Sequence, residues 1–343
     1  MENHQHLTYF KVENFKKFDS LEVKDIGQFN LIVGDNNVGK TCFLEALLFD
    51  KNKEAFARNL LDSLRRRGFI DFEITKNNTV KIKTPLNERK IRSRILKNYD
   101  EGIAVFSYSN NSLSKLDTQI LLKGSSFRSN GIDDFYNIEN LSFSVIAENS
   151  EYFNVIPFIG FNSLFSEDIY SLYNNIKTKN DKENLIKTIQ VIDSNIVDVE
   201  LRQNFEELDL VFLLSLKNKD EFIPVNYLGD GFKRIFYIIL KVLSLKGKRI
   251  MIDEIETGIH YSRQKDFWLN ILKICNELDV QIFATTHSNE CLQAFYEASK
   301  ELNEQKDIRL ISLQEGEQEK IYSTTYNFEN IEAGLYSNIE LRA

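Results

Sequence analysis

The stretch that decides the fold is FNLIVGDNNVGKT, residues 29–41. Its apolar start is typical of a buried strand, and the residues that follow it, 42–48, favour a helix. Between the two lies the spacing Gly34-x-x-x-x-Gly39-Lys40-Thr41. A strand, a glycine loop and a helix in this order are the context in which that spacing indicates a phosphate-binding P-loop.

The predicted P-loop has the chemistry of a nucleoside triphosphate site. Its glycines let backbone N–H groups curl around a β-phosphate, and the N-terminus of the helix adds its positive end. We expect Lys40 to reach the β- and γ-phosphates and Thr41 to hold Mg²⁺. The residues expected to bind ATP here are Gly34, Asn36, Asn37, Val38, Gly39, Lys40, Thr41 and Cys42. The alternative, an ordinary glycine turn, is disfavoured by the motifs farther along the chain.

The composition is that of a globular protein with a sizeable core. Of 343 residues, 42% are hydrophobic and 27% are charged. The net charge of −8 argues against a surface uniformly suited to nucleic acid. One segment, 81–97, is nevertheless basic and could contact nucleic acid or an acidic partner, although a solvated charged face is the commoner explanation. Its charged residues are Lys81, Lys83, Glu88, Arg89, Lys90, Arg92, Arg94 and Lys97.

Nothing in the sequence indicates secretion or membrane insertion, so we expect a cytoplasmic protein with no membrane partner. The first six residues have no basic region followed by an apolar one, and the longest apolar stretch, 235–245, is too short to span a bilayer. The three cysteines, Cys42, Cys275 and Cys291, fall in predicted helices and resemble small core residues in a reducing compartment. His4 and His6 have no cluster of further metal ligands, which favours a flexible terminus.

The hydrophobic pattern predicts an α/β protein in three parts. These are an N-terminal ATPase lobe with a β-rich insertion (1–160), a helical lobe (161–228) and a C-terminal ATPase lobe (229–343). The last third alternates strand and helix, which implies parallel βαβ units. Predicted strands are 7–12, 20–23, 29–33, 69–74, 79–83, 103–108, 141–146, 153–160, 197–201, 208–216, 249–253, 280–285 and 308–313. Predicted helices are 42–48, 55–67, 167–177, 182–192, 230–245, 259–275 and 288–299.

Two predicted strands of the last third end in polar residues suited to phosphate chemistry. The run RIMIDE, 249–254, is an apolar strand ending in two acids, typical of a Walker B motif. We expect Asp253 to support the nucleotide's Mg²⁺ and its waters, and Glu254 to polarise the attacking water. The next strand ends at His287, which could hydrogen-bond a γ-phosphate or that water. A solvated strand end is the alternative for the two acids, and the upstream P-loop weighs against it. A structural histidine is the alternative for His287, and its spacing behind the acidic strand weighs against that.

The stretch YLGDGFKR, 227–234, opens a strongly apolar helix just before the acidic strand. A glycine-flanked helix N-terminus can bind an anion, and its candidate contacts are Gly229, Asp230 and Gly231. Since the P-loop already cradles the chain's own nucleotide, a second phosphate-binding helix start would serve the nucleotide of another subunit. Taken alone, the stretch could equally be an ordinary glycine cap.

Taken in order, these motifs resemble the ABC-type ATPase heads shared by SMC, RecF and OLD proteins. The resemblance assigns 228–234 as the signature motif, 256–260 as the D-loop region and His287 as the switch histidine. It implies a P-loop NTPase that hydrolyses ATP to ADP and phosphate, with Glu254 and His287 as catalytic residues. The signature is LGDGF where transporters have LSGGQ, so the serine that would touch the γ-phosphate is replaced. The family's glutamine loop should lie near 106–165, where no residue identifies it.

The signature and the tail, 330–342, look more like the stand-alone OLD-like, AAA-family ATPases of prokaryotic phage-defence operons. That resemblance implies self-association around ATP as a homodimer or higher homo-oligomer. It also implies a separately encoded effector, a nuclease or toxin, because no nuclease or protease cluster is evident. The alternative is a RecF- or SMC-like ATPase that repairs or clamps DNA. A GTPase is disfavoured because TKND, 178–181, falls between two predicted helices.

Overall fold

The computed structural model describes most of the chain outside the β-rich insertion. The described residues are 6–49, 72–74, 79–82, 94–98, 103–109, 118–123, 134–137, 142–146, 157–160, 169–204, 209–302 and 305–336. The predicted helix 55–67, most of the basic segment 81–97, His4 and the end of the tail lie outside them. Within these ranges no helix is long and apolar enough to cross a bilayer.

The centre of the molecule is a six-stranded sheet that is parallel except for its last strand. In spatial order its strands are β10 (Phe158–Ile159), β14 (Arg249–Ile252), β15 (Gln281–Thr285), β3 (Phe29–Gly34), β16 (Ile308–Glu315) and β17 (Ile321–Asn327). Strands β3 and β15 are buried at every residue, which explains why their sequences are mostly apolar. The predicted parallel βαβ arrangement of the last third is therefore confirmed.

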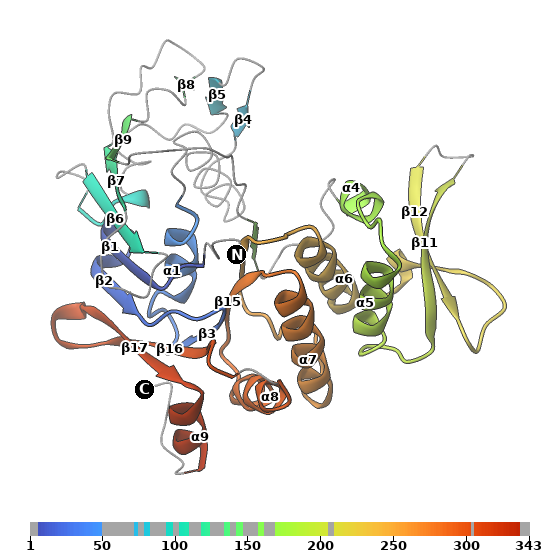
Figure 1. The fold of residues 1–343 in the computed structure, drawn as a ribbon. Coiled ribbons are helices and arrows are strands. Elements are labelled where there is room, and N and C mark those ends of the chain that lie inside the picture. The colour runs from blue at the N-terminus through green and yellow to red at the C-terminus, as the bar shows by residue number, and fades with distance from the viewer. Residues whose placement is uncertain are drawn as a thin grey trace.

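Both faces of this sheet are covered, so the fold has three layers (Figure 1). Leu31 packs on one face among helices of the C-terminal part, and Ile32 packs on the other face against the P-loop helix and an antiparallel sheet. The helices are α1 (Lys40–Ala46) on the second face and α6 (Asp230–Leu243), α7 (Tyr261–Glu277) and α8 (Asn289–Lys300) on the first.

The layer on the second face, beside α1, contains a five-stranded antiparallel sheet. Its strands, in spatial order, are β2 (Phe18–Lys24), β1 (Tyr9–Phe15), β6 (Ile103–Ser109), β7 (Thr118–Lys123) and β9 (Ser142–Ile146). The turn between β1 and β2 is tied to α1 by an ion pair of 2.6 Å between Lys16 and Glu45, whose side chains are only 6% and 0% exposed. A smaller sheet joins β4 (Phe72–Ile74), β5 (Thr79–Ile82) and β8 (Asp134–Asn137).

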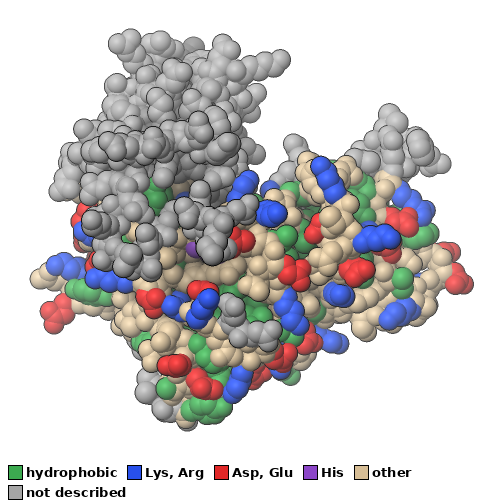
Figure 2. Space-filling model, viewed as in Figure 1, with side chains coloured by type: hydrophobic (Ala, Val, Ile, Leu, Met, Phe, Trp, Pro, Cys, Tyr) green, Lys and Arg blue, Asp and Glu red, His purple; other side chains and the backbone are tan. Residues whose placement is uncertain are grey.

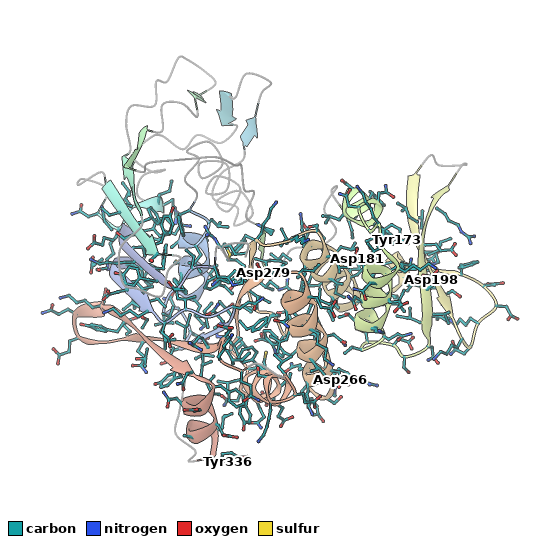
Figure 3. The ribbon with its side chains drawn as sticks, in the orientation of Figure 1. Tyr173, Asp181, Asp198, Asp266, Asp279 and Tyr336 are labelled. Carbon is teal, nitrogen blue, oxygen red and sulfur yellow. The ribbon has the colours of Figure 1, made fainter. Side chains whose placement is uncertain are left out.

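The segment predicted as a helical lobe also contains a three-stranded sheet (Figure 1). Its elements are α4 (Ile169–Asn174), α5 (Lys179–Ile189), β11 (Ile196–Asn204), β12 (Asp209–Leu216), β13 (Ile223–Pro224) and the 3-10 helix η2 (Val225–Tyr227). Figure 3 labels Tyr173, Asp181 and Asp198, which lie on α4, α5 and β11. Tyr173 donates to the Val199 carbonyl at 2.6 Å, and Lys182 pairs with Asp198 at 2.9 Å. Thr178 caps α5 through the Asp181 N–H, so TKND is a helix start and not a linker.

The C-terminal end of the described chain was not predicted. After β16 come the 3-10 helix η3 (Glu317–Glu319), β17 and helix α9 (Phe328–Tyr336). Thr325 donates its hydroxyl to the Lys24 carbonyl at 2.8 Å, which ties β17 to β2 and so joins the two sheets. His6 is not part of a free terminus, since its ring contacts the Asp279 carbonyl at 3.1 Å. Cys275 and Cys291 are buried as predicted, whereas Cys42 is half-buried.

The start of α6 packs closely against the turn that joins β14 to α7. A Cβ added to Gly231 would lie 2.4 Å from the carbonyl oxygen of Gly258, a distance that real contacts essentially never reach. Gly258 itself has a φ of 82°, in the left-handed region. By contrast, a Cβ added to Gly229 would meet nothing within 4 Å. Gly231 therefore allows two backbone segments to touch, while Gly229 lies open.

This difference predicts opposite outcomes for the same substitution at two nearby glycines. Gly231→Ser should lower the free energy of unfolding by about 1–3 kcal/mol, because backbone must move to admit the new atoms. Gly229→Ser should be neutral or slightly stabilising, because serine is a favoured N-cap residue. Urea denaturation of both variants measures this, and equal stability of the two would contradict the close packing of Gly231.

Candidate functional site

The P-loop lies between β3 and α1, where the sequence predicted it. Gly34 and Gly39 have φ values of 142° and 107°, which side chains other than glycine rarely adopt. A Cβ at Gly34 would also lie 2.3 Å from the Leu313 carbonyl oxygen. Lys40 is 5% exposed, and its Nζ donates to the carbonyls of Gly34 and Asp35 at 2.7 and 2.8 Å. The loop is thus a closed turn of backbone with a buried ammonium group held over it.

Two hydrogen-bond contacts fix α1 against the acidic strand β14. At the start of the helix, the Thr41 hydroxyl donates to Asp253 Oδ2 at 2.9 Å. At its end, the Arg249 guanidinium donates to the carbonyls of Leu47 and Phe49 at 3.2 and 2.6 Å. The two predicted metal ligands, Thr41 and Asp253, are therefore in direct contact although they are distant in sequence.

The donor set of Thr41 and Asp253 fits Mg²⁺. Both groups offer oxygen atoms, which this cation prefers, and Mg²⁺ is commonly held by one or two carboxylates together with substrate phosphates. Asp253 is 5% exposed and lies just beyond the end of β14, at the edge where parallel strands bind ligands. No group of three or more His, Cys, Asp or Glu side chains that could hold a metal occurs among the described residues.

Glu254 and His287 face each other at the ends of neighbouring parallel strands. The distance from His287 Nε2 to Glu254 Oε1 is 3.7 Å, and the side chains are 39% and 36% exposed. Glu254 has a φ of 49°, which is uncommon for a residue with a side chain. The structure thus brings together Thr41, Asp253, Glu254 and His287, while their roles in catalysis stay predictions.

Arg234 belongs to the site, and the sequence did not single it out. It projects from α6, is 3% exposed, and donates to the carbonyls of Gly160, Asp253 and Glu254 at 2.5, 2.5 and 3.2 Å. Burial lowers the pKa of its guanidinium, and the nearby Asp253 carboxylate opposes that shift. The sequence signal that could have identified Arg234 was its place in the signature stretch. Only the fold shows that its side chain points inward.

The signature residues lie at the surface end of α6. Gly229 is the N-cap residue and offers no side chain to the helix N-terminus. Gly229 and Asp230 are exposed, and Tyr227 is 82% exposed. On the adjacent turn, the rings of His260 and Tyr261 are in contact, tilted by 36° with centroids 4.4 Å apart. This end of the molecule therefore presents an open helix start beside exposed aromatic rings.

Comparison with known proteins gives one family match and several distant relatives. Residues 162–292 match the model of an AAA ATPase domain. An ATP/GTP phosphatase of Helicobacter pylori is 24% identical, over 94% of this chain and 96% of that protein. The Septu protein PtuA of Bacillus thuringiensis is 25% identical, over 83% and 72%. The DNA replication and repair protein RecF of Clostridium kluyveri is 23% identical, over 78% and 70%.

Among solved structures, the chain is similar to an Smc head domain with an extended coiled coil, derived from Pyrococcus furiosus and bound to the C-terminal domain of ScpA. The TM-score is 0.54 at 9% identity, over 98% of this chain and 100% of that one, which shows a shared fold. The predicted fold class is confirmed. Together with the ATPase domain match, the P-loop and the acidic strand, this indicates an ATPase that has the fold of an SMC head domain and is similar in sequence to RecF.

Proposed function

We propose that this ATPase acts as a switch: it binds ATP with Mg²⁺, self-associates around the nucleotide and controls a separately encoded effector in anti-phage defence. The observation that carries the catalytic part is the convergence of Thr41, Asp253, Glu254 and His287 at one edge of the sheet. These side chains come from α1 and from the ends of β14 and β15. Such an edge is where α/β sheets bind ligands.

Each side chain has a distinct task in this proposal. The P-loop N–H groups and Lys40 hold the phosphates, and Thr41 and Asp253 hold the metal ion. Mg²⁺, when bound, neutralises charge on the phosphate oxygens. Glu254 accepts a proton from the attacking water. His287, 3.7 Å from that carboxylate, is placed to hydrogen-bond the same water or the γ-phosphate.

A second copy of the chain completes the site in this proposal. The start of α6 is open to solvent and its N-cap residue has no side chain, so its N–H groups can receive phosphate from outside the chain. Tyr227 and Tyr261 are 82% and 67% exposed. Aromatic side chains of this kind are suited to anchor a protein interface.

The defence role and the effector rest on resemblance. The signature LGDGF followed by Lys233 and Arg234 resembles stand-alone OLD-like ATPases of phage-defence operons, and the similarity to the Septu protein PtuA supports the same direction. Co-purification with the product of a neighbouring gene would favour this role.

A DNA-repair or DNA-clamping role is the second candidate, supported by the similarity to RecF. On the face shown in Figure 2, basic and acidic side chains of the described residues are interspersed. The described residues of that face therefore form no single basic surface for DNA. Steeply salt-dependent binding of DNA by the isolated protein would favour this second role.

Glu254 is tested through its proposed role as the general base. Glu254→Gln should bind ATP normally but lose about 10²–10⁴-fold in hydrolysis, because the water loses its base. Its ATP-bound assembly should therefore accumulate and elute earlier in size-exclusion chromatography. Lys40→Ala should fail to bind ATP and should not shift. Hydrolysis at the parental rate by Glu254→Gln would remove this residue from its proposed role.

A substitution at the start of α6 tests whether the site is shared between copies. Gly231 is unsuitable for this test because a side chain there clashes within its own chain. Gly229→Glu has room for its side chain, and an acid near a helix N-terminus is favourable, yet its charge repels an incoming phosphate. It should bind ATP but hydrolyse it poorly, while Gly229→Ser stays active.

Mixing supplies the decisive measurement for that prediction. Gly229→Glu and Lys40→Ala are each inactive, but a mixed dimer has one site without either lesion. Partial ATPase activity should therefore reappear when the two are combined. Normal hydrolysis by Gly229→Glu alone would show that each chain holds a complete site.

A further inference from the structure

The end of β15 and the turn after β14 exchange hydrogen bonds in both directions. The Thr285 hydroxyl, on the strand, accepts the N–H of Glu254 in the turn at 2.8 Å. The Glu256 carboxylate, in the turn, accepts the N–H of His287 just beyond the strand at 3.0 Å. We call Thr285 and Glu256 the reciprocal clamp. Each member holds the backbone of one of the two facing residues, Glu254 and His287.

Thr285 makes a further bond in the same place. Its hydroxyl donates to Asp253 Oδ1 at 2.7 Å while it accepts from Glu254. A hydroxyl has one donor and two acceptor positions, so both bonds can form together. The residue is 0% exposed, and its backbone carbonyl also receives the N–H of Ile255 at 3.0 Å. One buried hydroxyl thus orients both acids of the turn.

The turn needs such support because of its backbone. The φ of 49° at Glu254 is sparsely populated by residues with a side chain, and it persists when the surroundings enforce it. Glu256 also has an unusual surrounding: its Oε2 is buried and has no hydrogen-bond partner among the described residues. A buried carboxylate oxygen in that state contributes little to stability, so Glu256 is not held in the turn by a full set of hydrogen bonds.

We infer that Thr285 and Glu256 are positioning residues that hold Glu254 and His287 face to face for ATP hydrolysis, without touching the nucleotide themselves. This inference rests on the proposed function, because it takes Glu254 as the base. The alternative is a purely structural role, in which both side chains only satisfy backbone N–H groups at a strand end. The two roles predict different results. A positioning role predicts that turnover falls while nucleotide binding stays the same, and a structural role does not.

Thr285→Val tests the strand side of the clamp, because valine keeps the shape and removes only the hydroxyl. Its kcat should fall by about 10²-fold, the effect of a small misplacement of a catalytic group. Its Kd for a fluorescent ATP analogue, measured without Mg²⁺ so that the bond to Asp253 does not enter, should stay at the parental value. Thr285→Ser, which restores the hydroxyl, should recover most of the rate.

A matched control removes a buried hydroxyl elsewhere. Thr188 is also 0% exposed, and its hydroxyl donates to the Asn184 carbonyl within α5 at 2.8 Å. Thr188→Val should hydrolyse ATP at the parental rate. A loss of turnover in Thr188→Val equal to that in Thr285→Val would assign both effects to general destabilisation and overturn the inference.

Glu256 provides an independent pair of variants, which carries the test if Thr285→Val does not fold. Glu256→Met removes the acceptor for the His287 N–H, and Glu256→Gln keeps it. Glu256→Met should lose turnover with an unchanged analogue Kd, and Glu256→Gln should lose much less. Equal loss in both variants, or weaker nucleotide binding in step with turnover, would contradict positioning.

Glu254→Gln, measured in parallel, separates the two proposals. If the clamp acts through Glu254, adding Thr285→Val to Glu254→Gln should cause no further loss of kcat. The double variant should then turn over as fast as Glu254→Gln alone. Parental activity of Glu254→Gln would overturn the proposed base itself. The clamp alone would be overturned by a different result. In that case Glu254→Gln is inactive, while Thr285→Val and Glu256→Met are as active as Thr188→Val, so Glu254 remains the base.

Discussion

The hydrogen bond between Thr41 and Asp253 is the contact on which the whole site depends, at 2.9 Å. The strands that lead to these residues, β3 and β14, are not neighbours, because β15 lies between them. The contact therefore requires the correct register of three parallel strands at once. Ile32 pairs with Thr285, and Ala284 pairs with Ile252, which brings the three strand ends to one level. The geometry of the site therefore depends first on the register of the sheet and only then on the conformation of the loops.

Much of this centre could be predicted because its signals are local. Strands buried on both faces have mostly apolar sequences, so β3, β14 and β15 were located nearly to the residue. The functional side chains directly follow those strands, and parallel order places strand ends at one edge. Asp253, Glu254 and His287 were therefore expected together without any knowledge of their distances. Their roles in catalysis are part of the proposed function.

The features that the sequence did not predict depend on contacts between distant segments. No local sequence pattern indicates such contacts. Thr285 looks like one more strand residue until the turn bearing Glu254 lies beside it. Gly231 looks like a phosphate contact, yet its own chain requires a glycine because Gly258 touches it. Arg234 follows Lys233 and resembles a surface base, although the fold buries it. Strand β17 is only partly buried, so its sequence has a weak apolar signal.

The central position of β3 also bears on how the molecule is made. Both neighbours of this early strand, β15 and β16, are encoded in the last third of the chain. Sheets built from such non-local pairings form slowly, because a long loop must close before any contact is gained. During synthesis, β3 must leave the ribosome long before its partners exist. The apolar P-loop strand is then an exposed edge that depends on the adjoining antiparallel sheet, or on a chaperone, for cover.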